Sequence, residues 1–268
     1  MKIKLHIHHI SLLVLALPLA SALAADGTDV AKKLANPIAA MISVPFQYNY
    51  DSDIGKDDTG SKSYLNIQPV IPISLNDDWN LISRTIVPIV WQDDIFSGAG
   101  HQSGIGSITE SLWFSPKAPT KDGWIWGAGP VFLLPTASNN LLGGDQWGAG
   151  PTAIALKQTG HLTYGGLANH VWSFANDTNE EISSTYLQPF FAYVTDAAVT
   201  YSLNSESSYN WETEQWSVPI NAQISKVLKV GEQLISLQAG VRYWAVTEAD
   251  SSPEGWGARL SLTFIFPK

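Results

Sequence analysis

Apolar and polar positions alternate along the stretch Trp256–Phe266. One parity carries Trp, Ala, Leu, Leu, Phe and Phe, and the other carries Gly, Arg, Ser, Thr and Ile. Successive side chains of a strand point to opposite faces, so this stretch predicts a strand with one apolar face and one polar face. About a dozen stretches of this kind, each roughly ten residues long, recur along the chain, a pattern typical of a membrane-spanning β-barrel.

The alternation predicts about twelve antiparallel strands in up-and-down order. The clearest candidates are Ile42–Tyr50, Tyr64–Ile73, Trp79–Gln92, Val199–Tyr209, Trp216–Ser225, Leu234–Ala245 and Trp256–Phe266. Weaker candidates are Ser107–Ser115, Trp124–Leu134, Trp147–Leu156, Leu162–Ser173 and Ser183–Tyr193. The expected fold is therefore all-β, a transmembrane antiparallel barrel whose even strand number leaves both chain ends in the periplasm.

Prolines inside the predicted strands complicate this picture, because each removes one donor from the hydrogen-bond ladder. They are Pro45, Pro69, Pro72, Pro88, Pro130, Pro151, Pro189 and Pro219. An unpaired carbonyl is costly in lipid. We therefore expect these prolines near the membrane interfaces, at bulges, or facing a hydrated lumen.

The N-terminus has the pattern of a secretory signal peptide: a positive start, a short apolar core and an Ala-x-Ala motif ending at Ala24. We expect residues 1–24 to be a cleaved signal, residues 25–41 to be a periplasmic segment or plug, and residues 42–268 to form the barrel. A short helix capped at Thr28 and ended before Pro37 is predicted in the second part. No other stretch approaches about 18 uninterrupted apolar residues, so helical spans are not expected.

Composition narrows the possible chemistry. Eleven Trp in this length fit the aromatic belts of a membrane barrel. The chain has no Cys, which excludes disulfide and thiolate chemistry. Its net charge of -9 argues against a nucleic-acid partner. No motif suggests a cofactor.

Charges are sorted along the chain. Lysines avoid the clearest strands, whereas Arg84, Arg242 and Arg259 lie inside strands on the polar parity. This placement avoids the roughly 2–4 kcal/mol that a cation on the lipid face costs at the midplane. Loops after odd-numbered strands are strongly acidic and mostly longer, so we expect them to be extracellular. An acidic mouth concentrates cations, and solubility is the simpler explanation for the same charge.

The polar parity supplies candidate lumen residues. Inward side chains are expected to include Arg84, Arg242, Arg259, Glu206, Gln68 and Asn221. Glu110 is a further candidate, although it shares parity with the apolar Leu112. Such groups either set pore selectivity or form an Arg–Glu network that holds a narrow barrel together. Arg242 and Arg259 come from adjacent strands, so one cationic patch is a further expectation.

Catalytic and metal sites receive weaker support. His101 and Ser103 share one face, as nucleophilic catalysis requires, but the sequence shows no third group or oxyanion site for them. A catalytic outer-membrane phospholipase is therefore a disfavoured interpretation, and we expect no enzyme. Four acids have a spacing loosely suited to calcium without the glycine or terminal glutamate of an EF-hand loop: Asp51, Asp53, Asp57 and Asp58.

Several segments together resemble a known family. They are residues 34–47, 66–69, 76–84, 115–117, 127–135, 168–170, 215–221 and 240–244, among them Gln-Trp-Ser-Val-Pro-Ile-Asn at 215–221 and Gly-Val-Arg-Tyr-Trp at 240–244. The chain resembles, over essentially its whole expected mature length, bacterial outer-membrane proteins usually labelled as transporters. This family is similar to the group tied to the meta-pathway of phenol degradation. The resemblance implies an outer-membrane barrel.

These observations lead to one functional hypothesis and one alternative. The first is a bacterial outer-membrane barrel that passes small molecules passively, with hydrophobic or aromatic solutes among the candidates. The alternative is a structural or surface-binding barrel with an occluded lumen. Expected partners are outer-membrane lipid, a small-molecule solute and, through Phe264 and Phe266, the barrel-assembly machinery.

Overall fold

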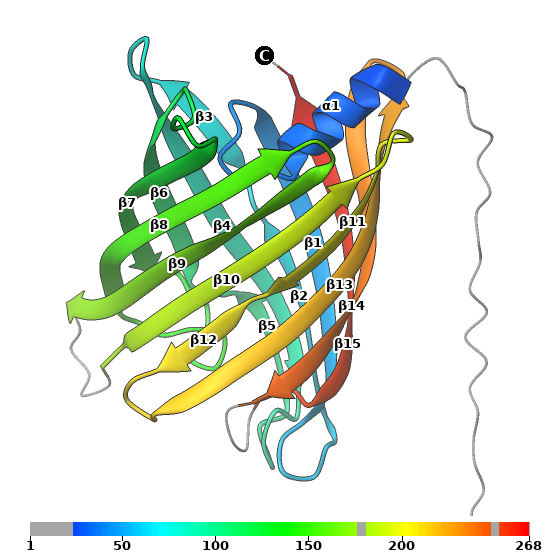
Figure 1. The fold of residues 1–268 in the computed structure, drawn as a ribbon. Helices are drawn as coiled ribbons and strands as arrows, with labels where there is room; N and C mark the ends of the chain where they lie inside the picture. The colour runs from blue at the N-terminus through cyan, green and yellow to red at the C-terminus, as the bar shows by residue number, and fades with distance from the viewer. Residues whose placement is uncertain (1–23, 176–180, 248–251, 268) are drawn as a thin grey trace, which may run out of the picture.

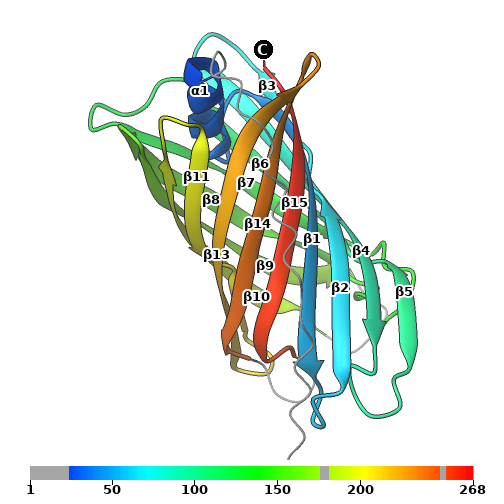
Figure 2. The same ribbon diagram turned by 90° about the vertical axis from the view of Figure 1, so that its right-hand side faces the viewer.

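A computed structural model describes residues 24–175, 181–247 and 252–267, which form a closed antiparallel barrel with one helix at one end (Figure 1). The elements are α1 (Ala24–Leu34), β1 (Ile42–Ile54), β2 (Gly60–Ile67), β3 (Val70–Ser74), β4 (Trp79–Asp93), β5 (His101–Ile105), β6 (Ile108–Pro116), β7 (Trp124–Leu134), β8 (Trp147–Thr159), β9 (Leu162–Ala175), β10 (Ser183–Val194), β11 (Val199–Ser205), β12 (Ser207–Asn210), β13 (Gln215–Val230), β14 (Gln233–Val246) and β15 (Gly255–Phe266). Figure 2 shows the barrel from the side where β1 meets β15. The expected signal peptide falls almost wholly on residues outside the described ranges.

The barrel closes where β1 pairs with β15, in a register that runs from Ile42 opposite Phe266 to Asp51 opposite Gly257. Every neighbouring pair is antiparallel, and three crossings are divided by a short break: β2 and β3, β5 and β6, and β11 and β12. The fifteen segments therefore make twelve crossings, as the alternation predicted. The predicted strand Ser107–Ser115 missed the segment that is now β5.

Proline explains the breaks. Pro69 lies between β2 and β3, and Gly106, between β5 and β6, donates its N–H to the carbonyl of Pro88 across the gap. The break between β11 and β12 falls beside Pro219, where the register of β13 against β14 shifts. A proline has no N–H to donate, so the ladder cannot run through these points. The expectation that prolines lie at bulges is confirmed at Pro219.

The two faces of the wall differ in polarity. On β15 the outward Trp256 and Leu260 are 64% and 57% exposed, whereas the inward Arg259 is 2% exposed. The exterior around the barrel is apolar, and the interior holds most of the polar and charged side chains together with one buried apolar cluster. That cluster consists of Ile38, Ile82, Trp113, Ile154, Leu156 and Leu167. Hydrocarbon chains can cover such an exterior, and every backbone group of a closed barrel finds a partner within the wall.

Exposed aromatic side chains gather in two bands on the exterior, one near each end of the strands. The first band includes Tyr50, Trp91, Trp172, Trp211, Trp216 and Trp256, and the second includes Trp124, Trp126, Tyr164, Tyr193, Tyr201 and Phe266. Amphipathic rings favour the two membrane interfaces, so the bands mark the membrane boundaries. The second band lies at the end with α1 and the tight turns at 160–161 and 231–232, the periplasmic end in barrels of this type.

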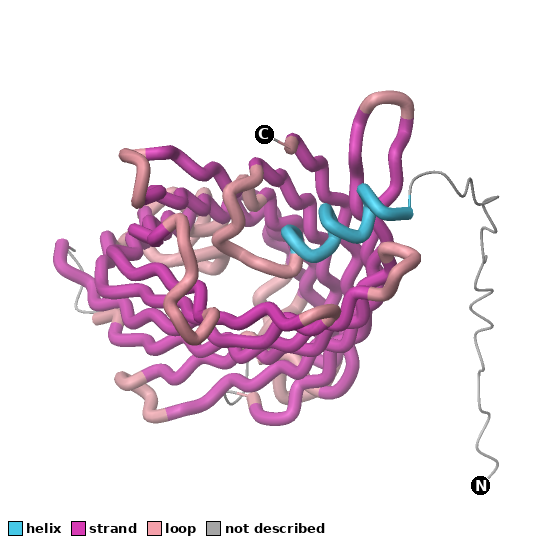
Figure 3. The backbone as a smooth tube through the Cα atoms, turned by 45° about the horizontal axis from the view of Figure 1, so that its top comes forward, coloured by secondary structure: helices cyan, strands magenta, loops and turns pink. Residues whose placement is uncertain are grey.

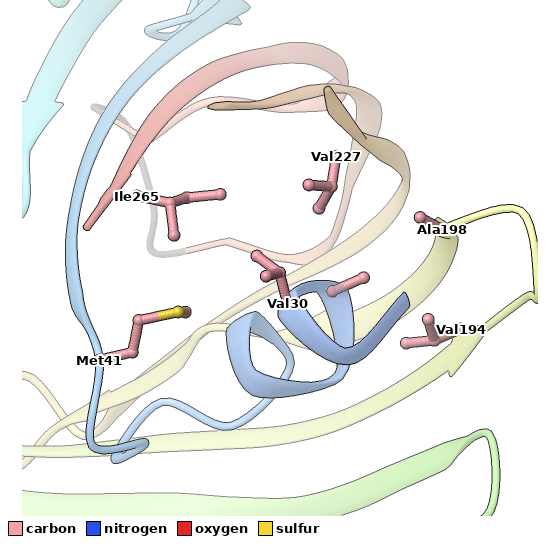
Figure 4. Packing of buried hydrophobic residues seen from close by; sticks show 7 residues of the cluster. Val30, Met41, Val194, Ala198, Val227 and Ile265 are labelled. Atoms are coloured by element: carbon pink, nitrogen blue, oxygen red, sulfur yellow. The ribbon is translucent and has the colours of Figure 1, made fainter. Parts of the chain in front are cut away.

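Helix α1 lies at the periplasmic opening of the barrel (Figure 3). Val30 and Ala31 pack with Met41 against Val194, Val227 and Ile265 of the wall (Figure 4). This packing fixes α1 against the inner side of the wall. None of the described helices is long and apolar enough to cross a membrane.

Two local predictions need correction. Thr28 does not cap the helix, which already begins at Ala24; its hydroxyl instead donates to the carbonyl of Asp196 at 3.0 Å and so ties α1 to the wall. Lysines also enter the strands, at Lys62 of β2, Lys157 of β8, and Lys226 and Lys229 of β13. They lie toward the strand ends, where a long side chain reaches water.

Candidate functional site

Two cavities occupy the lumen. The periplasmic one, about 280 Å³, lies against α1 and the segment that follows it, and the second, about 600 Å³, lies further into the barrel. The two cavities share six lining residues: Gln47, Gln68, Arg84, Gln188, Asn204 and Gln238. We call these six residues the collar. Five are amides and one is a cation, so a solute moving between the cavities passes hydrogen-bonding groups.

A charged network lies in the wall of the larger cavity. Arg259 donates from both terminal nitrogens to Glu206, at 2.8 and 2.7 Å, and Arg242 donates to Glu206 at 3.2 Å. Arg242 also donates to Asp51 at 3.0 Å and to the hydroxyl of Tyr64. We call Asp51, Glu206, Arg242 and Arg259 the ion network. Its two cations and two carboxylates balance.

Neutral side chains complete the ion network. Asn49 accepts from both arginines, at 3.2 Å from Arg242 and 2.7 Å from Arg259, and Asn221 accepts from Arg242 Nε at 2.9 Å. Trp244 Nε1 donates to Asp51 at 2.9 Å. These contacts join β1, β13, β14 and β15 to the break that holds Glu206. Buried charges tolerate desolvation when they are paired and fully hydrogen-bonded, as here.

Arg84 of β4 stands apart from the ion network. Among the described residues, no carboxylate lies within 4.0 Å of its guanidinium, and its Nε is buried without a hydrogen bond. Its guanidinium lies over the ring of Trp113, 5.2 Å from the centroid. Arg84 lines both cavities, so it presents to them a cation that has no carboxylate within ion-pair distance among the described residues.

The sequence-derived candidates thus fall into two groups. Arg242, Arg259 and Glu206 belong to the ion network, and Asn221 accepts a hydrogen bond from it. The expected cationic patch of Arg242 and Arg259 is not formed, because Asp51 and Glu206 neutralise both cations. Gln68 and Arg84 belong to the collar. Sequence reasoning missed Asp51 as a lumen residue, because the first strand was ended at Tyr50. The alternation already held the signal, since Asp51 continues the parity of Gln47 and Asn49.

Glu110 is the inward candidate that the structure moves to the other face. It pairs with Thr85, whose neighbour Arg84 points inward, so Glu110 points outward. Its carboxylate accepts from the hydroxyls of Ser83, at 2.6 Å, and Thr85, at 2.5 Å. Leu112 on the same parity was the correct signal.

The acidic candidates for calcium are not brought together. Asp51 is buried in the ion network and 2% exposed, Asp53 lies at the extracellular rim, and Asp57 and Asp58 lie in the exposed turn after β1. No group of three or more metal-binding side chains occurs within the described ranges.

The catalytic candidate, His101 with Ser103, has an acidic residue beside the histidine and no contact between the histidine and the serine. His101 Nδ1 lies 2.8 Å from Asp93 on an exposed rim. Ser103 shares that face, yet no hydrogen bond joins it to His101 among the described residues. A serine nucleophile needs that contact for activation.

A closed barrel with an apolar exterior, two aromatic bands and a polar lumen defines the chain as a β-barrel of the outer-membrane type. Residues 55–251 of the 268 match the family described as "Putative MetA-pathway of phenol degradation", and the chain belongs to that family. No curated protein matches the sequence.

Solved structures share the architecture. The COG4313 outer membrane channel from Pseudomonas putida F1 is similar with a TM-score of 0.67 and 15% identity, over 85% of this chain and 96% of that one. A NanC porin is similar with a TM-score of 0.50 and 10% identity, over 83% of this chain and 98% of that one. At these identities the likeness concerns the fold.

Proposed function

We propose that this protein is a passive channel for small molecules in the bacterial outer membrane. The observation that carries the proposal is the lumen: cavities of about 600 and 280 Å³ meet at a collar of amides and one cation inside a membrane barrel. A barrel with only a structural role is better stabilised by a packed apolar interior than by cavity-lining amides that have no hydrogen-bond partner among the described residues. The similar Pseudomonas putida protein carries the description of an outer membrane channel, which supports the same function here.

Helix α1 makes the proposal specific, because it narrows the periplasmic exit. Val30 and Ala31 hold it against the wall, and Gln158 donates to the carbonyl of Lys32 at 2.8 Å. A solute that leaves the collar toward the periplasm therefore passes beside α1. The alternative, a surface-binding barrel with an occluded lumen, requires the exit at α1 to stay shut.

Conductance measurements distinguish the two. We expect the protein reconstituted in planar bilayers to give small, defined current steps, and a variant lacking residues 25–38 to give larger steps. The matched control is Asp29→Asn, which changes an exposed charge on α1 and leaves its packing intact. Absence of steps in both the full protein and the deletion variant, across several salts, would overturn the channel and favour the occluded barrel.

We also propose that the last strand is recognised by the barrel-assembly machinery through Phe264 and Phe266. Phe266 is 44% exposed, and Phe264 points outward in an edge-to-face contact with Phe46, ring centroids 5.9 Å apart. Replacing Phe266 by Ser should lower the amount of folded protein in outer membranes more than replacing Phe114, which is 46% exposed on another strand. Equal losses would remove the special role of the last strand.

A further inference from the structure

We propose that Arg84 and the collar form a binding site for a small monocarboxylate with an apolar body. This inference rests on the proposed channel and names the class of solute that the lumen holds. Its starting point is a difference in charge between two parts of one lumen. Arg242 and Arg259 are matched by Asp51 and Glu206, whereas Arg84 has no carboxylate partner among the described residues.

The Arg84 side chain is held in place before any ligand arrives. It lies over Trp113, which is fully buried and donates from Nε1 to the hydroxyl of Thr152 at 3.1 Å. A guanidinium stacked on a fixed ring loses little freedom when an oxyanion binds, and its planar fork matches the two oxygens of a carboxylate. Its terminal nitrogens are not among the buried atoms that lack a partner, and the side chain lines both cavities.

The collar amides supply further hydrogen bonds without charge. The side chains of Gln47, Gln68, Gln188 and Gln238 make no hydrogen bond to other described residues, and all four line both cavities. An amide N–H donates to a carboxylate as readily as its carbonyl accepts from a hydroxyl. One cation with several amides favours a single negative charge over two.

An apolar surface begins next to Arg84. Ile86 follows it on the same face of β4, and the register places Ser111 opposite Arg84 and Val131 opposite Ser111. Leu133 continues this surface along β7, and all three apolar residues line the larger cavity. A bound acid with its carboxylate at Arg84 can therefore lay its carbon chain on Ile86 and Leu133, with the fully buried Val131 packed behind them. Burial of that chain favours butyrate over acetate.

The binding test uses equilibrium titration, so it does not require an open pore. Carboxyl-labelled ¹³C butyrate is titrated into the full protein in detergent, and its carboxyl line width is followed. We expect saturable binding that is weaker by about tenfold or more in Arg84→Gln, as expected for loss of a charge-assisted hydrogen-bond pair. Lys117→Gln, which removes an exposed rim cation bonded to Ser74, is the matched control and should bind as the wild type does.

Ligand series and conductance separate the possible failures. Butyrate should bind more tightly than acetate and succinate, and butyramide should show no dependence on Arg84. Equal affinity of wild type and Arg84→Gln for butyrate overturns the carboxylate site, even if current steps persist and the channel stands. Arg84-dependent binding without any current steps upholds the site and overturns the channel. Arg84→Ala, which keeps no hydrogen-bonding group, checks that Gln does not replace the site.

Discussion

The ion network and the collar hold arginines of the same charge in the same lumen, with opposite surroundings. Arg242 and Arg259 each reach a carboxylate within 3.2 Å, and both are 2% exposed. Arg84 reaches an aromatic face and open cavity instead. Arginines that are paired with carboxylates stabilise the wall, whereas an arginine without a carboxylate partner can bind a solute. The comparison shows that an inward position alone does not distinguish a structural arginine from a solute-binding one.

Arg242→Ala gives the largest expected effect. It leaves the buried carboxylate of Asp51 without a cation, and it removes one of the two arginines that donate to Glu206. We expect the free energy of unfolding to fall by about 3–5 kcal/mol. Urea unfolding in lipid vesicles, followed by tryptophan fluorescence, measures it. Arg84→Ala is the control and strands no carboxylate. Equal losses in the two variants would erase the distinction between network and collar.

Glu206→Gln comes next, since it removes one carboxylate and leaves Arg259 with neutral partners only. We expect a loss of about 1–3 kcal/mol in the same unfolding assay, together with a reversal potential shifted toward chloride because the lumen gains one net positive charge. Adding Arg259→Gln restores the charge balance. That double variant should recover the reversal potential, and a persistent shift would mean that the network does not control the charge of the lumen.

Arg84→Gln should change selectivity with little change in stability. The lost contact is a cation–π pair of about 0.5–1 kcal/mol, while the reversal potential in a KCl gradient should shift toward potassium. The control is Asp57→Asn with Asp58→Asn in the exposed extracellular turn. The shift in reversal potential caused by this control should fade at 1 M salt, where the Debye length is about 3 Å. The shift caused by Arg84→Gln should persist more strongly. Identical salt dependence would place both groups in open solvent.

Glu110→Gln is the smallest expected change and mirrors Glu206→Gln on the other face of the wall. Glu110 meets only the hydroxyls of Ser83 and Thr85, so an amide of the same shape keeps hydrogen-bonding capacity. We expect the unfolding free energy to change by less than about 1 kcal/mol and the reversal potential to stay constant. A shifted reversal potential would place this carboxylate in the lumen.

The sequence predicted the barrel class and most strand limits because alternation is local. For the same reason it placed Arg84, Arg242, Arg259 and Asn221 on the inner face. It could not tell which arginine finds a carboxylate, since Asp51 and Arg242 lie far apart in the chain and meet only when the barrel closes. Glu110 was misplaced because short strands next to Gly106 read equally well in either parity.

The ladder breaks have a mechanical consequence. Gln68 lies in one of them, Asn204 stands next to another, and β4, which carries Arg84, runs between the first and the gap at 106–107. An interrupted hydrogen-bond ladder opens more easily than a continuous one such as the pairing of β14 with β15, which runs without a register shift. The collar therefore lies beside interrupted ladders, where the wall should widen most easily for a larger solute, while the pairing between β1 and β15 stays continuous.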